Sequence, residues 1–327
     1  METLASYRKP VLITGAAGFI GSHLADRCLS LGRQVIAVDS FSHYYPEALK
    51  RRNIAAASSH PNCVVLEADL LDIDLPHLLE EVGIVFHLAA QPGVRASWED
   101  FDLYSRLNVT ATQRLLDAAR GIALDRVVVA SSSSIYGDAE ALPTTEDLPP
   151  RPVSPYGVTK VATEHLARVY WQNFGVPAVC LRYFTVYGPR QRPDMAFHKL
   201  ISCALSGQPF EVFGDGAQTR DFTFVADAVE ATLAAAQRGR PGMAYNIGGG
   251  SRVSMNAVFD ALEQLVGRPL DREYVSRQAG DARDTAADIG LAQRDLGFAP
   301  SFSFMAGLAA QVEWEAPLMA ASLALVR

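Results

Sequence analysis

Val11-Leu12-Ile13-Thr14-Gly15-Ala16-Ala17-Gly18-Phe19-Ile20-Gly21 is the stretch of sequence that decides the fold. Its first four residues are apolar or β-branched and predict a buried strand. The glycines are spaced GxxGxxG, and a helical pattern follows from Ser22 to Leu31. Gly15 allows a tight turn, Gly18 lets the backbone approach a pyrophosphate, and Gly21 lets the helix pack against the strand. Free N–H groups at the helix N-terminus suit phosphates, so this stretch predicts a dinucleotide site.

A second predicted strand, Gln34–Val38, ends at Asp39. An acidic residue about 20 residues after the glycines suits a ribose 2′-hydroxyl and repels a 2′-phosphate. The sequence therefore favours NAD over NADP. The alternative is a glycine-rich turn that binds nothing, and the strand, helix and Asp39 in register count against it.

Predicted strands and helices alternate as far as about Arg182. The strands are expected at Val11–Thr14, Gln34–Val38, Cys63–Glu67, Gly83–His87, Arg126–Ala130 and Ala178–Arg182. Such alternation predicts an α/β fold, a Rossmann-type doubly wound parallel sheet. Short strands at Phe210–Phe213, Phe222–Phe224, Tyr245–Ile247 and Glu273–Val275 then suggest a smaller C-terminal lobe. We expect a nucleotide-binding domain at 1–185 and a substrate-binding lobe at 186–327, with a boundary that the chain crosses more than once.

Composition narrows the class of protein. The chain has 327 residues, 49% of them hydrophobic and 20% charged, which fits a soluble globular protein. A net charge of −7 argues against nucleic acid and anionic membranes as main partners. The cysteines are scattered without a CxxC pair and predict reduced residues, not disulfides or metal ligands. We therefore expect no metal site. With no apolar signal segment at the start, we expect a cytoplasmic protein.

Tyr156 and Lys160 lie four residues apart in Ser-Pro-Tyr-Gly-Val-Thr-Lys. On a helix this spacing puts both side chains on one face. A neighbouring ammonium favours the phenolate, so Lys160 is expected to lower the pKa of Tyr156 and make it a base for an alcohol. A solvated helix face is the alternative, because the spacing also occurs by chance.

A run of serines, Ser131 to Ser134, follows the predicted strand Arg126–Ala130. Ligands of open α/β sheets bind beyond the carboxyl ends of the strands, where hydroxyl groups both donate and accept hydrogen bonds. Taken alone, the run is more typical of a polar loop that caps a helix.

Together, the glycine loop, the serine run and the Tyr-Lys pair resemble the extended branch of the short-chain dehydrogenase/reductase superfamily, in its nucleotide-sugar epimerase group. The likeness covers nearly the whole chain. It implies NAD as cofactor and a UDP-sugar as substrate. The cofactor-binding residues that it implies are Gly15, Gly18, Phe19, Ile20, Gly21, Asp39, Asp69, Leu70, Ala89, Ala90, Asn108, Lys160 and Tyr183.

The resemblance also implies the catalytic roles. Tyr156 takes the proton of a sugar hydroxyl, Ser132 bonds the same oxygen, and Lys160 binds the cofactor ribose. The related dehydratases carry an Asp-Glu pair after the triad hydroxyl, and the decarboxylases carry a Glu, whereas this chain has Ser133-Ser134. Without that acid, we expect the 4-keto sugar to rotate within the site and take the hydride back on its other face, which is 4-epimerisation.

Four stretches of the chain most resemble the bacterial UDP-glucuronate 4-epimerases: 39–45, 91–95, 184–189 and 192–196. UDP-glucose 4-epimerases typically have Asn at the position of Thr185. A hexuronate needs polar or cationic groups for its carboxylate. The implied substrate residues are Pro92, Ser133, Ser134, Thr185, Arg192, Arg220, Gln278 and Asp281. Arg192 has an alternative role as a structural partner of Asp194.

Other readings stay open. A UDP-glucose 4-epimerase, a UDP-glucuronate decarboxylase and a net NAD-dependent oxidoreductase are alternatives, and a cofactor sensor is the weakest because the Tyr-Lys pair is kept. The helices expected at Leu103–Ala119 and Tyr156–Asn173 resemble the pair that forms a homodimer through a four-helix bundle. His87, at a strand end, is expected to be structural.

Overall fold

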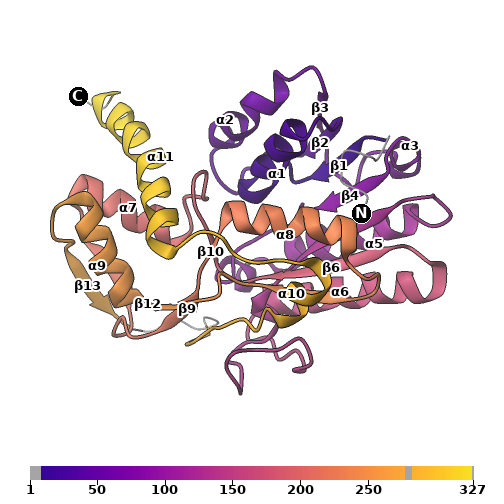
Figure 1. Cartoon of the computed structure of the whole chain (residues 1–327). Helices are drawn as coiled ribbons and strands as arrows, with labels where there is room; N and C mark the ends of the chain where they lie inside the picture. The colour runs from indigo at the N-terminus through magenta and orange to yellow at the C-terminus, as the bar shows by residue number, and fades with distance from the viewer. Residues whose placement is uncertain (1–8, 277–281, 326–327) are drawn as a thin grey trace.

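A sheet of seven parallel strands forms the centre of the protein in the computed structural model (Figure 1). The structure describes residues 9–276 and 282–325, except for the side chains of 321–325. The strand order is β11-β6-β5-β4-β1-β2-β3. Their bounds are β1 Val11–Thr14, β2 Val35–Asp39, β3 Cys63–Glu67, β4 Ile84–His87, β5 Arg126–Ser132, β6 Ala178–Tyr183 and β11 Ala244–Ile247. The predicted doubly wound α/β fold is confirmed.

Helices cover both faces of this sheet, and a separate apolar core fills each side. One layer holds α1 (Phe19–Ser30), α2 (Glu47–Ser58) and α8 (Val225–Arg238). The opposite layer holds α3 (Leu75–Glu80), α5 (Ala111–Ala118) and α6 (Pro155–Phe174), with α4 (Phe101–Tyr104) and a π-helical segment at Ser105–Thr110 leading into α5. The single helix predicted at Leu103–Ala119 is therefore two α-helical pieces joined by a π-helical one.

A smaller group of elements lies beyond the sheet, where Figure 1 shows α7, α9 and α11 together. Its helices are α7 (Ala196–Ser206), α9 (Met255–Val266) and α11 (Phe304–Leu325), whereas α10 (Gly290–Leu296) packs against α8 and β11 of the main sheet. Its short strands pair as β7 (Val186–Tyr187) with β10 (Thr223–Phe224), β8 (Phe210–Phe213) with β13 (Arg272–Val275), and β9 (Thr219–Asp221) with β12 (Arg252–Ser254). Among the described residues, no helix has the length and apolarity needed to cross a bilayer.

Two strand predictions differ from the structure. Of the stretch Phe222–Phe224, expected as one strand, Thr223 and Phe224 form β10, and Phe222 lies between β9 and β10. The strand around Tyr245, expected in the smaller lobe, instead pairs with β6 and closes the main sheet, Tyr245 lying opposite Leu181. Its short apolar run gave no sign of its neighbour, because pairing depends on a contact across more than 60 residues.

The glycine turn between β1 and α1 leaves no room for side chains. Gly15 has a φ of +69°, and a Cβ there would lie 2.8 Å from the Ala89 backbone nitrogen. A Cβ on Gly21 would lie 2.1 Å from the carbonyl oxygen of Gly15. These contacts bring α1 against the start of the turn, so that its N-terminus faces the carboxyl edge of the sheet.

Substitution of Gly21 by alanine tests this packing. The added methyl group would meet backbone, which cannot rotate away, so we expect a loss of about 1–3 kcal/mol in the free energy of unfolding and a roughly tenfold or greater loss of dinucleotide affinity, about 1.4 kcal/mol per tenfold. Denaturant titration and calorimetry would measure the two effects.

Gly32→Ala is the control, because its φ is +75° and a Cβ there meets nothing within 4 Å. It carries only the cost of the left-handed backbone, about 1–2 kcal/mol, and should keep its dinucleotide affinity. Equal affinity in both variants would contradict the packing role of Gly21.

Candidate active site

A cavity of about 1550 Å³ opens at the carboxyl ends of the central strands. Gly15, Ala89 and Ser132 line it from the loops after β1, β4 and β5, and the smaller lobe closes its other side. Arg95 reaches across, its guanidinium 4.3 Å from the ring centroid of Phe213. Ligands of open α/β sheets bind at this edge, so the fold places the cavity where a substrate and cofactor would meet.

One half of the cavity fits a dinucleotide. The turn at Gly15 and Gly18 presents bare backbone, and the N-terminus of α1 follows it. Asp39 is buried, and its carboxylate accepts from the backbone N–H groups of Ala17 (3.0 Å) and Phe41 (2.8 Å). That bonding fixes the carboxylate at the end of β2, where a ribose hydroxyl would donate to it. The cavity is lined by Gly15, Gly18, Phe19, Ile20, Gly21, Asp39, Asp69, Leu70, Ala89, Ala90, Lys160 and Tyr183.

Asn108, also predicted to bind the cofactor, lies elsewhere: it does not line the cavity. It is buried behind the loop after β4, where its Oδ1 accepts from the Gln91 N–H (2.7 Å) and its Nδ2 donates to the Gln91 carbonyl (3.1 Å). Nδ2 also lies 3.0 Å from the Thr159 hydroxyl. In this structure Asn108 therefore ties the loop that lines the cavity to the helix that carries Tyr156.

Helix α6 brings Tyr156 and Lys160 to the cavity from one face. Ser154 caps the helix by accepting from the Gly157 N–H, and Pro155 occupies the first turn, where a missing N–H costs nothing. Lys160 donates to the carbonyl oxygen of Ala130 (2.9 Å), and its Nζ lies 5.8 Å from the Tyr156 ring centroid. The predicted juxtaposition is therefore present.

The acidity of Tyr156 differs from the prediction. Burial raises the pKa of the phenol, while the positive charge of Arg192 and a hydrogen bond to Ser132 lower it, and burial prevails. Lys160 is itself desolvated, which lowers its pKa to about 8. The prediction that Lys160 lowers the pKa of Tyr156 is wrong for this structure, because the charge that opposes burial of the phenol comes from Arg192.

The serines of the run 131–134 have different hydrogen-bond partners. Ser132 donates to the Ser134 hydroxyl (3.0 Å) and accepts from the Ser134 N–H (3.1 Å), which holds it beside Tyr156. Ser131 donates to Glu164. Ser132, Ser133 and Ser134 all line the cavity, so the hydroxyls predicted to meet the sugar are present at one place.

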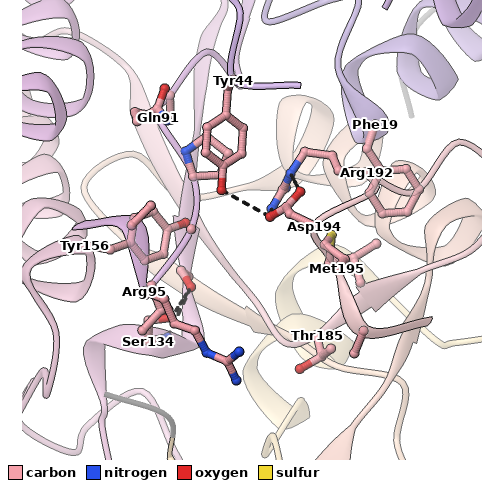
Figure 2. A pocket seen from close by; sticks show the side chains of 18 of the residues that line it. Phe19, Tyr44, Gln91, Arg95, Ser134, Tyr156, Thr185, Arg192, Asp194 and Met195 are labelled. Atoms are coloured by element: carbon pink, nitrogen blue, oxygen red, sulfur yellow. Dashed lines mark hydrogen bonds and ion pairs between the residues drawn. The ribbon is translucent and has the colours of Figure 1, made fainter. Parts of the chain in front are cut away.

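Arg192 lies on the opposite wall, on the loop between β7 and α7. Its Nε is 3.0 Å from Asp194 Oδ1, and its Nη2 is 3.1 Å from Oδ2. Tyr44 donates to the same carboxylate at 3.1 Å (Figure 2). The structural pair considered as an alternative for Arg192 therefore exists, yet Arg192 still lines the cavity together with Pro92 and Thr185.

Arg220 is the remaining predicted substrate residue that the structure describes. Arg220 lines the cavity and donates to the carbonyl oxygens of Thr219 (3.0 Å) and Arg283 (2.6 Å). Arg283 lines it as well. Gln278 and Asp281 lie outside the residues that the structure describes.

Several residues that shape the site carried no functional signal in the sequence. Tyr104 packs edge-on against Tyr156, with ring centroids 6.3 Å apart, and donates to the carbonyl oxygens of Pro92 and Gly93. Glu164 follows Lys160 by four residues and Tyr156 by eight, a helical spacing that would have placed it on the same face. Tyr44 came within a stretch already singled out, but its contact with Asp194 spans 150 residues.

Other polar groups are structural. His87 is buried between the hydroxyls of Thr14 (2.8 Å) and Thr112 (3.0 Å), and burial lowers its pKa to about 3, as expected of a neutral core histidine. The four cysteines are free thiols, as predicted. Within the part of the chain that the structure describes, no cluster of three or more His, Cys, Asp or Glu side chains is arranged to hold a metal ion.

Known proteins resemble this chain over nearly its full length. The sequence is 43% identical over 309 residues to the uncharacterized UDP-glucose epimerase YtcB of Bacillus subtilis, covering 93% of this chain and 97% of the relative. It is 35% identical over 311 residues to UDP-glucuronate 4-epimerase of Thermodesulfobacterium geofontis, covering 93% and 95%.

A solved structure agrees. The UDP-glucuronic acid 4-epimerase of Bacillus cereus, in complex with UDP-glucuronic acid and NAD, superimposes with a TM-score of 0.92 at 43% identity and covers 94% of this chain and 99% of that one. The model of the NAD-dependent epimerase/dehydratase family matches residues 11–248. The chain belongs to the NAD-dependent epimerase/dehydratase family, within the extended short-chain dehydrogenase/reductases.

Proposed function

We propose that this protein is an NAD-dependent nucleotide-sugar 4-epimerase that interconverts UDP-glucuronate and UDP-galacturonate. One observation carries the proposal: Tyr156 and Ser132 share a cavity with Arg192, while the positions after Ser132 bear hydroxyls and no acid. The relatives and the solved structure named above support the substrate class.

The cofactor half of the cavity would hold NAD. The backbone N–H groups at the glycine turn would bind its pyrophosphate and Asp39 would accept from a ribose hydroxyl. Lys160 lies within the cavity beside Tyr156. Bound NAD supplies the hydride acceptor and donor for the sugar carbon.

Tyr156 and Ser132 would handle the proton. Tyr156 as phenolate removes the proton of the sugar 4-hydroxyl, and Ser132 donates a hydrogen bond to the same oxygen as it becomes a carbonyl. When the carbonyl is reduced from its other face, Tyr156 returns the proton. Because Tyr156 is buried and its pKa is raised, a cationic partner must favour the phenolate, and Arg192 is the largest such contribution in the structure.

The neighbours of Ser132 favour epimerisation over elimination. Expulsion of water needs an acid and a base next to the reacting carbons, and Ser133 and Ser134 provide neither at neutral pH. The nearest described carboxylate on the sugar side, Asp194, is paired with Arg192. Elimination of water is therefore disfavoured, and reduction back to an alcohol completes the proposed epimerisation.

Arg192 and the hydroxyls of Ser133, Ser134 and Thr185 would hold the carboxylate of a hexuronate. A guanidinium binds a carboxylate through two parallel hydrogen bonds. Asp194 favours a second candidate, UDP-glucose 4-epimerase, because its charge already neutralises Arg192.

The assembly is also part of the proposal. We infer a cytoplasmic homodimer in which residues 1–185 mainly bind NAD and residues 186–327 mainly bind the nucleotide sugar. Val158 and Val169 are 48% and 43% exposed. They lie 11 residues apart on α6, about three turns, and so share one face. Trp98 and Phe101 are exposed on the neighbouring segments, 60% and 48%. An apolar face across adjacent helices fits a self-complementary four-helix bundle.

Incubation of the protein with NAD and UDP-glucuronate tests the activity. We expect UDP-galacturonate by NMR, with little turnover of UDP-glucose, and we expect Tyr156→Phe to abolish turnover while NAD stays bound. UDP-galactose formation alone would move the assignment to the neutral hexose, a pentose product would show a decarboxylase, and full activity of Tyr156→Phe would refute the proton-transfer role.

Lys160 gives a pH test of burial in the site. Its folded pKa of about 8 lies below the ordinary 10.5, so the unfolded chain binds more protons between these values and stability rises with pH there. The desolvation cost, about 3 kcal/mol at 1.36 kcal/mol per pKa unit, is present below pH 8 and absent above 10.5.

We therefore expect the wild-type protein to gain up to about 3 kcal/mol in unfolding free energy relative to Lys160→Met between pH 7 and 10.5. Urea denaturation of both proteins, after removal of bound nucleotide, measures this difference. A difference that does not change with pH would show that Lys160 is not desolvated.

Val158→Glu combined with Val169→Glu tests the dimer face. Two buried carboxylates facing their own copies across a symmetry axis repel, so sedimentation velocity should show a dimer for the wild type and a monomer for this variant. Val64→Glu is the matched control, because Val64 is 56% exposed on the edge strand β3. A monomeric wild type would overturn the proposed assembly.

A further inference from the structure

The loop that carries Arg192 has an unusual backbone. Gly188 has a φ of +136° and Arg190 a φ of +64°. A residue with a Cβ rarely adopts the left-handed region, and such a conformation costs of order 1–3 kcal/mol unless its surroundings fix it. The loop from Gly188 to Asp194 is therefore held from outside, and the contacts that hold it also set the position of Arg192.

Gln311, on the C-terminal helix α11, makes the most extensive of these contacts. Its Oε1 accepts from the Gly188 N–H (2.8 Å), and its Nε2 donates to Gln191 Oε1 (3.1 Å) and to Glu315 Oε1 (2.8 Å). The side chain is fully buried, so the three bonds have no water to replace them. Gln311 thus binds the loop on both sides of Arg190, at Gly188 and at Gln191.

Gln191 passes this constraint on to the residue next to it, Arg192. Its Nε2 donates to the Val186 carbonyl (3.1 Å), and its Oε1 also accepts from the His198 N–H (3.0 Å). His198 in turn pairs with Glu315 (3.2 Å). β7, the loop and the start of α7 are therefore joined to α11 through buried polar groups.

The cofactor helix holds the opposite side of the same loop. His23, on α1, bonds the Pro189 carbonyl (2.8 Å), and Asp26 pairs with Arg190 (2.7 Å). With α1 on one side and α11 on the other, the loop has little freedom, and the Arg192 guanidinium is directed into the cavity beside Asp194.

We propose that Gln311 is a positioning residue for Arg192 and thereby sets how strongly the site prefers a UDP-hexuronate over the neutral UDP-hexose. Gln311 does not line the cavity and follows Arg192 by 119 residues in the chain. A bidentate guanidinium–carboxylate contact tolerates displacements of only about 0.5 Å, so loosening of the loop weakens the acid more than the neutral sugar. The proposal rests on the uronate assignment made above.

The test is a double-mutant cycle on sugar discrimination. Calorimetry with the NAD-loaded protein gives the Kd of UDP-glucuronate and of UDP-glucose. The Kd of UDP-glucose divided by the Kd of UDP-glucuronate measures the preference for the carboxylate. We expect Arg192→Met to lower the ratio by roughly tenfold or more, since a charge-assisted bond contributes about 1.5–3 kcal/mol. Gln311→Met, which keeps the size but removes the hydrogen bonds, should lower it roughly three- to tenfold, about 0.7–1.4 kcal/mol.

The second half of the cycle separates positioning from general damage. In the Arg192→Met background, Gln311→Met should change the ratio no further, because nothing remains for it to position. The Kd of UDP alone should stay the same in every variant. Glu313→Met is the control, on an exposed position of the same helix, and should leave the ratio unchanged.

Each other outcome is decisive. A ratio that Gln311→Met leaves at the wild-type value, or lowers equally in both backgrounds, overturns the positioning role. A wild-type ratio near one overturns the uronate assignment, and the proposal with it. If Gln311→Met does not fold, Gln191→Met removes the loop side chain to which Gln311 donates, and the same cycle with it must show the same loss.

Discussion

The buried ion pair between Arg182 and Glu164 is the constraint on which the site depends. Arg182 lies next to the last residue of β6, and its guanidinium bonds Glu164 of α6 through Nη2 (2.8 Å) and Nε (3.0 Å). Glu164 shares its helix face with Lys160 and Tyr156, two successive turns away. Burial of two charges costs about as much as their attraction returns, so the value of this pair lies in its geometry: it fixes how α6 is rotated and how far it slides along the sheet. The position of Tyr156 therefore depends on the Arg182–Glu164 ion pair, two turns further along α6.

The same pair organises the surrounding loops. Ser131 donates to Glu164, which ties the first serine to α6, while Ser132 lines the cavity beside Tyr156. Arg182 also donates to the Tyr136 hydroxyl, which donates to Asn246 of β11 (2.8 Å). Strand β11, which comes late in the chain, is thereby bonded to the strand that ends in the serine run. A polar network of this kind is stable only when each member is satisfied, so its parts hold one arrangement together.

The extent to which the sequence predicted this structure follows from the range of the contacts. The β1–α1 turn was predictable because the spacing of Gly15, Gly18 and Gly21 after a strand is a local pattern. Local spacing and family resemblance predicted Ser132, Tyr156 and Lys160. The pairing of β11, the grip of Gln311 on Gly188 and the tie between Tyr44 and Asp194 join residues far apart, and no local pattern specifies them. The acidity of Tyr156 was mispredicted for the same reason, since the charge that opposes its burial comes from Arg192, on another lobe.

The ion pair between Arg192 and Asp194 has a consequence for the kinetics of recognition. A guanidinium with its own carboxylate presents little net charge at a distance, and the whole chain carries −7. Arg192 would therefore give an acidic sugar little long-range attraction over a neutral sugar on the same nucleotide. Under the proposed uronate assignment the preference would arise after binding, because a carboxylate held by Arg192 would slow dissociation.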